Sequence, residues 1–219
     1  MSAVFRILLS TSVSAVTVSW TDWQSSTSNS ANGQLLAGGS TVDVSYTGTG
    51  AHSFVQTTPG KDYWTGSAYT NGVVANAPNS SSTDVIALNQ GGTVTLSFSQ
   101  AINNPFIAMN SWNGNLVDFT SNINIDSFGQ GYWGNGTAIN VTPTGFTGSG
   151  EFHGIISLIG NFKSISFTHT SENWHGFTVG VAGLARPPGQ VPIPAAAFMF
   201  APALLGFMGL RRRAKNKAI

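Results

Sequence analysis

The stretch Thr93-Val94-Thr95-Leu96-Ser97-Phe98 alternates hydroxyl-bearing and apolar side chains without a break. Successive side chains of a β-strand point to opposite faces, so Val94, Leu96 and Phe98 are expected to face a core. The hydroxyl groups are then expected to face water, as in an antiparallel sheet that is buried on one side. The stretch therefore predicts an all-β fold built from half-buried antiparallel strands.

Similar short segments, separated by Gly, Asn and Ser clusters, recur on both sides of this stretch. Strands are expected at residues 42–46, 93–98, 106–109, 116–120, 154–159, 164–168 and 177–181. No helical period of 3.6 residues appears before residue 190, and no repeat of fixed length argues for a propeller or solenoid. Short strands with turn signals about every ten residues predict a jelly-roll-like antiparallel β-sandwich over residues 16–185.

Charged residues make up only 8% of the chain, and five of its nine basic residues lie in the last nine positions. Between residues 16 and 190, three basic residues stand against all eight acidic ones, a formal charge of −5. Nucleic acid is not an expected partner, because binding it requires clustered Lys and Arg. The chain has no cysteine, which excludes disulfides, thiolate nucleophiles and Cys-based metal sites.

The two ends of the chain differ in character from the body. Residues 1–15 contain Arg6, a short apolar run and small residues at Val13 and Ala15, so we expect a secretory signal peptide in truncated form. A first β-strand or a misassigned start codon are the alternatives. Residues 186–190 include Pro187 and Pro188 and are expected to form a linker, because proline cannot donate to a sheet.

An uncharged apolar run covers residues 195–210. Sixteen helical residues span about 24 Å, close to the hydrocarbon core of a bilayer at about 30 Å. Arg211, Arg212 and Arg213 follow directly, and such a basic cluster stays in the cytoplasm. We therefore expect a single C-terminal transmembrane helix with a cytoplasmic C-terminus. The alternatives are a tail-anchored protein with a cytosolic body and a buried helix of a soluble protein.

The tail has three ordered parts: Val191-Pro192-Ile193-Pro194-Ala195-Ala196, an apolar helix, and the arginine cluster. Together they resemble the PEP-CTERM protein-sorting signal, although the commoner form has Glu where this chain has Ile193. The resemblance implies recognition by an exosortase and removal of the helix near the proline motif Val191, Pro192, Ile193 and Pro194. It also implies a precursor in the inner membrane and a body released to the cell surface or the exterior. Less specifically, residues 104–106 and 172–180 resemble the β-rich ectodomains that precede such signals.

Several aromatic residues fall in Gly- and Asn-rich segments. The candidate contacts to carbohydrate are Trp64, Trp112, Tyr132 and Trp133, with Tyr63 and Tyr69 in similar surroundings. Aromatic rings could stack on sugar faces while neighbouring amides bond the hydroxyls. The alternative is that these rings fill the sandwich core, which is the usual use of large aromatic residues. Trp174 and Phe177 are expected to pack in the core as part of the last strand.

Other patterns are weaker indications of chemistry. Glu151, Glu172 and Asp118 are candidates for a glycosidase pair if two of them converge in a cleft. Residues 122–126 place three oxygen-bearing side chains on one face of a strand, but they lack the Gly and distal Glu of an EF-hand loop. The Gly-x-Gly-x-x-Gly match at residues 129–134 has no following helix that could bind a phosphate. No metal site or cofactor is therefore predicted.

These observations together predict an exported surface or matrix protein, sorted by an exosortase and associated with exopolysaccharide, without catalytic activity. A lectin-like carbohydrate-binding module is the first alternative, and a secreted glycoside hydrolase is the second.

Overall fold

The computed structural model describes residues 15–78 and 84–182. The expected signal peptide, except for its last residue, lies outside the described residues, as do the linker, the sorting motif, the apolar run 195–210 and the basic tail. Within the described ranges, no helix has the length and apolar character needed to span a bilayer.

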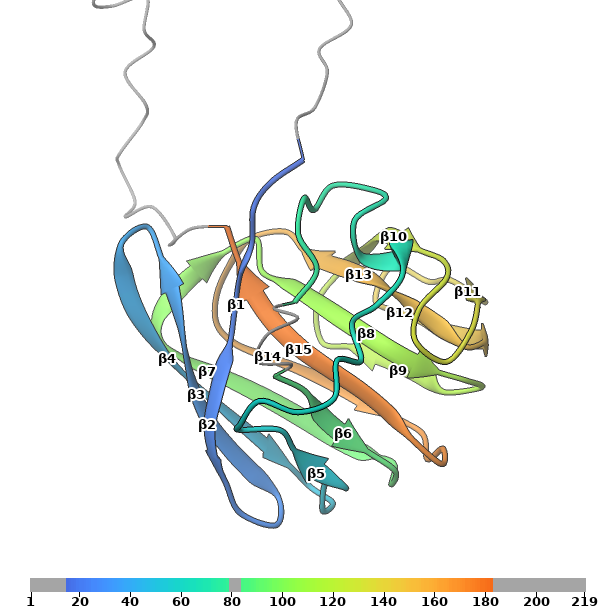
Figure 1. Ribbon diagram of the computed structural model, residues 1–219, viewed down its shortest axis with the longest axis horizontal. Coiled ribbons are helices and arrows are strands. Elements are labelled where there is room, and N and C mark those ends of the chain that lie inside the picture. Colours follow the sequence, from blue (N-terminus) through green and yellow to red (C-terminus); the bar gives the residue numbers. More distant parts are fainter. Residues whose placement is uncertain (1–14, 79–83, 183–219) are drawn as a thin grey trace, which may run out of the picture. The chain divides into compact units, whose positions relative to one another are not determined.

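The chain folds into two antiparallel β-sheets (Figure 1). The seven-stranded sheet has the order β10 (Ile123–Phe128), β13 (Phe152–Leu158), β8 (Phe106–Trp112), β15 (His175–Val181), β6 (Ile86–Leu88) and β5 (Phe54–Val55), and β1 (Ser19–Trp20) also pairs with β15. The eight-stranded sheet has the order β11 (Gly136–Ile139), β12 (Gly145–Gly150), β9 (Leu116–Phe119), β14 (Asn161–His169), β7 (Gly92–Asn103), β4 (Ser40–Gly48), β3 (Ser30–Ala37) and β2 (Asp22–Ser26). One short 3-10 helix, η1 (Ser67–Tyr69), completes the secondary structure of the described residues. The predicted all-β antiparallel class is thus confirmed.

Every strand expected from the sequence is present, and β7 has the predicted alternation. Val94, Leu96 and Phe98 are buried, whereas Ser97 is exposed. The prediction missed β3, which contains the turn-like dipeptide Asn32-Gly33. This glycine is needed inside a strand because a Cβ atom there would lie 2.4 Å from the carbonyl oxygen of Asp22 on β2. A close approach between two backbones therefore explains the glycine.

The central strands β8, β13 and β15 are buried along their whole length. One face of their sheet packs on the sandwich core, which also receives the inward side chains of β3, β4 and β7. The other face is covered by residues 56–78, which follow β5 and run across it in Figure 1. This second layer is a separate apolar cluster: Val18, Trp64, Ala68, Tyr69, Val74, Val85, Phe106, Ala108 and Ile155. Burial on both faces explains the continuous apolar runs in these strands.

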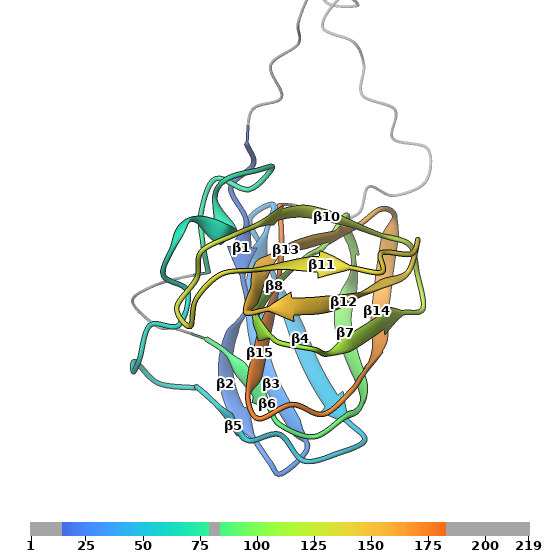
Figure 2. The ribbon, with the colours of Figure 1, turned by 90° about the vertical axis from the view of Figure 1, so that its right-hand side faces the viewer.

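The connections carry the chain repeatedly from one sheet to the other. The first half of the fold pairs with the second half in reverse order: β6 with β15, β7 with β14, β8 with β13 and β9 with β12. Figure 2 shows β10 and β11, each at one edge of its sheet, on the same side of the sandwich. The turns that follow β8, β12 and β14 lie together, because Asn113 bonds to Glu151 and Asn115 bonds to Thr170, and this end holds the candidate site.

Candidate functional site

Four aromatic side chains meet at this end and are called the aromatic cluster here: Tyr63, Tyr132, Trp133 and Trp174. Their ring centroids lie 5.4 Å apart for Tyr63 and Tyr132, 4.9 Å for Tyr132 and Trp133, 5.9 Å for Trp133 and Trp174, and 5.2 Å for Trp174 and Tyr63. The contacts thus form a closed ring of four side chains. Trp133 is 51% exposed, and the other three are half-buried. The cluster therefore presents aromatic surface to solvent.

Three separate loops supply these rings. Tyr63 follows β5, Tyr132 and Trp133 lie between β10 and β11, and Trp174 lies between β14 and β15. Phe54 of β5 also contacts Tyr63 and Trp174, at 6.3 and 6.5 Å between centroids. Because the rings come from loops that are distant in sequence, the fold alone brings them together.

Backbone contacts hold the loop of Tyr132 and Trp133 in place. Gly131 donates its N–H to the carbonyl of Gly134 at 2.8 Å, closing a tight turn around the two rings. The backbone of Gly131 also lies on the ring of His153, where an added Cβ atom would be 2.2 Å from Cγ. The loop of Tyr63 is held in turn by Asn110 of β8, whose side-chain amide donates to the Tyr63 carbonyl. Two of the three ring-bearing loops are therefore fastened to central strands.

Two carboxylates border the aromatic cluster. Glu151 accepts hydrogen bonds from the hydroxyl of Ser111 and from the amide of Asn113, the latter at 3.2 Å. Its Cγ would lie 3.4 Å from a Cβ atom added at Gly134, next to Trp133. Glu172 accepts the backbone N–H of Trp174 at 3.1 Å. Burial raises the pKa of Glu172, and the negative charge of Glu151 raises it further. The two carboxylates therefore interact electrostatically.

Buried histidines lie beneath the site. His175 Nε2 and His169 Nδ1 are 3.0 Å apart, and Trp112 packs on His175 with ring centroids at 4.6 Å. Burial, together with a smaller effect of the neighbouring His169, lowers the pKa of His175 to about 3. Glu172 lies 3.6 Å from His175 Nδ1, but at neutral pH this imidazole carries no charge. The contact is thus no ion pair, and the histidines act as neutral packing groups.

His153 forms a second buried group. Its Nδ1 lies 3.1 Å from the hydroxyl of Tyr69 and accepts the N–H of Ser111 at 3.3 Å. Its Nε2 is buried without a hydrogen-bond partner. Burial lowers the pKa of this imidazole to about 4. A neutral His153 is therefore the support on which Gly131 and its loop rest.

The four aromatic residues proposed from the sequence as carbohydrate contacts fall into two groups in the structure. Tyr132 and Trp133 belong to the aromatic cluster. Trp64 and Trp112 are only 2% and 0% exposed, and the indole of Trp112 donates to the carbonyl of Gly176 at 2.8 Å. These two rings serve packing, which the sequence had left as the alternative, and they offer no surface to a ligand.

The position of Trp174 differs from the one expected from the sequence. It was expected in the core, but it lies one residue before β15 begins and its ring packs with the cluster. Phe177, inside the strand, is fully buried as expected. Asn173, a residue type that favours turns, stands directly before Trp174 and was the sequence signal for a ring outside the strand.

The remaining predicted groups are dispersed. Asp118 lies on the solvent face of β9 and accepts a hydrogen bond from Thr144 at 2.7 Å. Asp126 of β10 is bonded to Ser157 at 3.0 Å. Among the described residues, no three His, Asp or Glu side chains are grouped so that they could hold a metal ion. The glycine motif 129–134 lies between two strands and presents Tyr132 and Trp133.

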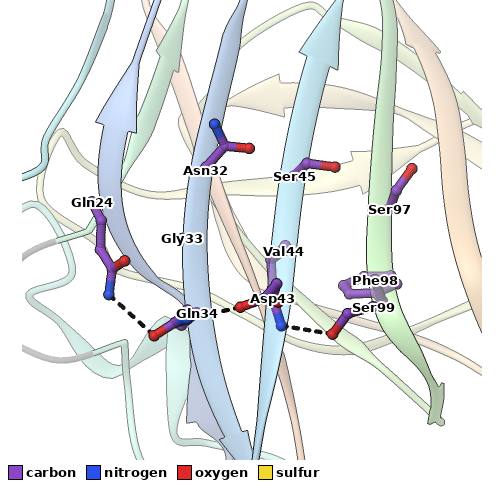
Figure 3. A pocket seen from close by; sticks show the side chains of 10 residues that line it. All are labelled: Gln24, Asn32, Gly33, Gln34, Asp43, Val44, Ser45, Ser97, Phe98 and Ser99. Carbon is purple, nitrogen blue, oxygen red and sulfur yellow. Dashed lines mark hydrogen bonds between the residues drawn. The ribbon is translucent and has the colours of Figure 1, made fainter.

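The other candidate site is a hollow on the outer face of the eight-stranded sheet (Figure 3). It is shallow and crosses β2, β3, β4 and β7, and some of its polar groups bond to each other. Gln34 donates to Asp43 at 2.7 Å, and the backbone N–H of Asp43 donates to Ser99 at 2.9 Å. Because Gln34, Asp43 and Ser99 are already bonded to one another, the aromatic cluster is the stronger candidate site.

Comparison of the chain with protein-family models, with curated proteins and with solved structures found no match. The geometry of the aromatic cluster and its two carboxylates is therefore the basis on which a function can be argued.

Proposed function

We propose that the protein is an exported surface or matrix protein whose β-sandwich binds carbohydrate through the aromatic cluster. The observation that carries this proposal is the closed ring of Tyr63, Tyr132, Trp133 and Trp174, which presents aromatic surface at a loop-bearing end of a sandwich. Exposed aromatic surface that is rimmed by polar groups is typical of a ligand site. Aromatic faces suit the apolar faces of sugar rings, and the carboxylates of Glu151 and Glu172 suit sugar hydroxyls.

A matched pair of variants tests this proposal. The full chain, purified in a neutral detergent, is titrated with soluble polysaccharides while tryptophan fluorescence is recorded. Trp133→Ala removes the most exposed ring of the cluster and is expected to abolish the response. Phe128→Ala removes an aromatic ring of similar exposure, 46%, on β10 outside the cluster, and should bind as the parent chain does. Equal binding by both variants would place the ligand elsewhere and contradict the proposal.

We also propose a jelly roll as the topology of the sandwich. The reversed pairing of β6 to β9 with β12 to β15 supports it, because each half of the chain supplies alternate strands of both sheets. Two interlocked four-stranded groups of this kind define the jelly roll.

The export route is proposed from the sequence. The proline motif at residues 191–194, the apolar run 195–210 and the three arginines at 211–213 support processing by an exosortase. The precursor would lie in the inner membrane, its tail spanning the bilayer with the basic residues in the cytoplasm. The intact mass of protein recovered from the native envelope and medium tests this route. Loss of a piece that begins near Val191 is expected, whereas an intact tail on a cytosolic protein would contradict the topology.

We propose no catalytic activity. The electrostatic interaction of Glu151 with Glu172 is the observation that favours the alternative, a glycoside hydrolase. A carboxyl with a raised pKa beside an ionised one is the arrangement that glycosidases use. Release of new reducing ends from a bound polysaccharide, lost in Glu172→Gln, would establish cleavage. Unchanged chain length after prolonged incubation is the expected result.

A further inference from the structure

The charge around the aromatic cluster is unbalanced. The described residues include all eight acidic residues of the chain but only two basic ones, Lys61 and Lys163. Glu151 and Glu172 border the cluster, and Asp62 precedes Tyr63. Lys163 lies on β14 and donates to a carbonyl of β7. A ligand that approaches the cluster therefore meets an excess of negative charge.

One ammonium group of the protein already rests on this aromatic surface. Lys61 Nζ lies 5.0 Å from the centroid of the Tyr132 ring, within the range of a cation–π contact. Trp133 contacts Tyr132, and Trp174 contacts Trp133 in turn, with ring centroids at 4.9 and 5.9 Å. Indole rings attract cations more strongly than phenol rings do. The cluster is thus suited to hold a second ammonium group, supplied by a ligand.

The charges of the two glutamates also favour a ligand that carries an ammonium group. They repel each other, and the raised pKa of Glu172 reflects both its burial and this repulsion. The buried Nδ1 of His175 points at Glu172 from 3.6 Å and has no hydrogen-bond partner. Because that imidazole is neutral, it does not offset the carboxylate charges. A cation near Glu172 would offset this repulsion and favour the ionised form of Glu172.

We infer that the glycan bound by the aromatic cluster carries free ammonium groups, as a deacetylated amino-sugar polymer does. The inference rests on the proposed carbohydrate-binding function. Sugar rings stack on the aromatic faces, the ammonium groups lie between the indoles and the carboxylates of Glu151 and Glu172, and polymers with carboxylate or sulfate groups are repelled.

Two oligosaccharides that differ only in the charged group test this inference. The full chain in neutral detergent is titrated by calorimetry, at pH 6 and low salt, with a β-1,4-linked glucosamine hexamer and with its fully N-acetylated counterpart. The deacetylated hexamer is expected to bind about fivefold to thirtyfold more tightly, from one exposed ion pair and one cation–π contact. Glu172→Gln should remove the ion-pair contribution and reduce this preference to about twofold to fivefold, the part that the cation–π contact supplies. Added salt should also weaken it.

Asp43→Asn is the matched control, since it removes the same charge from β4, outside the cluster. It should keep the full preference for the deacetylated hexamer. Equal affinity of the parent chain for both hexamers, or tighter binding of the acetylated one, would overturn the inference and leave carbohydrate binding intact. A chain that binds neither hexamer nor any other polysaccharide would overturn the inference together with the proposed function.

Discussion

The buried imidazole of His153 should make the stability of the protein fall in mild acid. In the folded protein burial lowers its pKa to about 4, whereas in the unfolded chain the ordinary value is about 6.5. As the pH falls below about 6.5, the unfolded chain binds a proton that the folded protein does not. Proton binding then favours the unfolded state. The free energy of unfolding should therefore be unaffected above about pH 7 and decrease between pH 6.5 and pH 4.

The size of the effect follows from the pKa difference. One pKa unit corresponds to about 1.36 kcal/mol, so at pH 5 the contribution of His153 is a loss of about 2 kcal/mol. His175, whose pKa is lowered to about 3, should contribute a similar loss at this pH. About 4 kcal/mol in total is a large fraction of the 5 to 15 kcal/mol that is typical of folded domains.

Urea unfolding of the full chain at pH 7, 6 and 5 measures this loss. The variant His153→Gln removes one titrating group, so its unfolding free energy should fall by about 2 kcal/mol less over the same range. The comparison uses the pH dependence and not the absolute stability, so a variant that is less stable overall remains informative. NMR titration adds an independent check, because the chain has only four histidines. A His153 signal that titrates near pH 6.5, or equal pH dependence in both proteins, would refute the reasoning.

Two further predictions concern packing and are measured as urea midpoints. Gly131→Ala should cost about 1–3 kcal/mol and weaken carbohydrate binding, because the new Cβ atom meets the His153 ring at 2.2 Å. Gly50→Ala, whose Cβ atom has no neighbour closer than 3.4 Å, should stay within about 0.5 kcal/mol of the parent. Trp112→Ala removes a fully buried ring and its hydrogen bond to Gly176 and should cost about 3–5 kcal/mol. Trp133→Ala, at the half-exposed cluster, should cost less than about 1 kcal/mol, and equal losses for the two tryptophans would contradict the burial assignment.

Local alternation was sufficient to predict most of the sandwich. The strands β4, β7 and β14 each bury one face and leave the other to water, so their sequences record the period of two. The short edge strand β11 was not recognised from the sequence because it is only four residues long and only partly buried. The Asn-Gly pair within β3 has the composition of a turn, and only the approach of β2 explains it.

The candidate site was less accessible to sequence reasoning because burial depends on contacts between distant segments. Trp64 and Tyr132 both lie in glycine-containing loops. Trp64 is buried because the segment between β5 and β6 folds across the outer face of the seven-stranded sheet. Tyr132 lies at the solvent-facing end beside Tyr63. Nothing local in the sequence distinguishes these two outcomes, since each depends on which strand the loop meets.

The glycine spacing of residues 129–134 matches that of a phosphate-binding loop but has a different structural role in this protein. In a phosphate-binding loop the glycines let a ligand approach the backbone in front of a helix. Here Gly129 and Gly134 have φ angles of 155° and 144°, which residues other than glycine rarely adopt. Gly131, between them, lies on His153. The glycines thus form a tight support for Tyr132 and Trp133, and this support depends on a neutral imidazole. Protonation of His153, which in the folded protein requires a pH near 4, should consequently loosen two of the four rings, so that carbohydrate affinity declines at a lower pH than fold stability does.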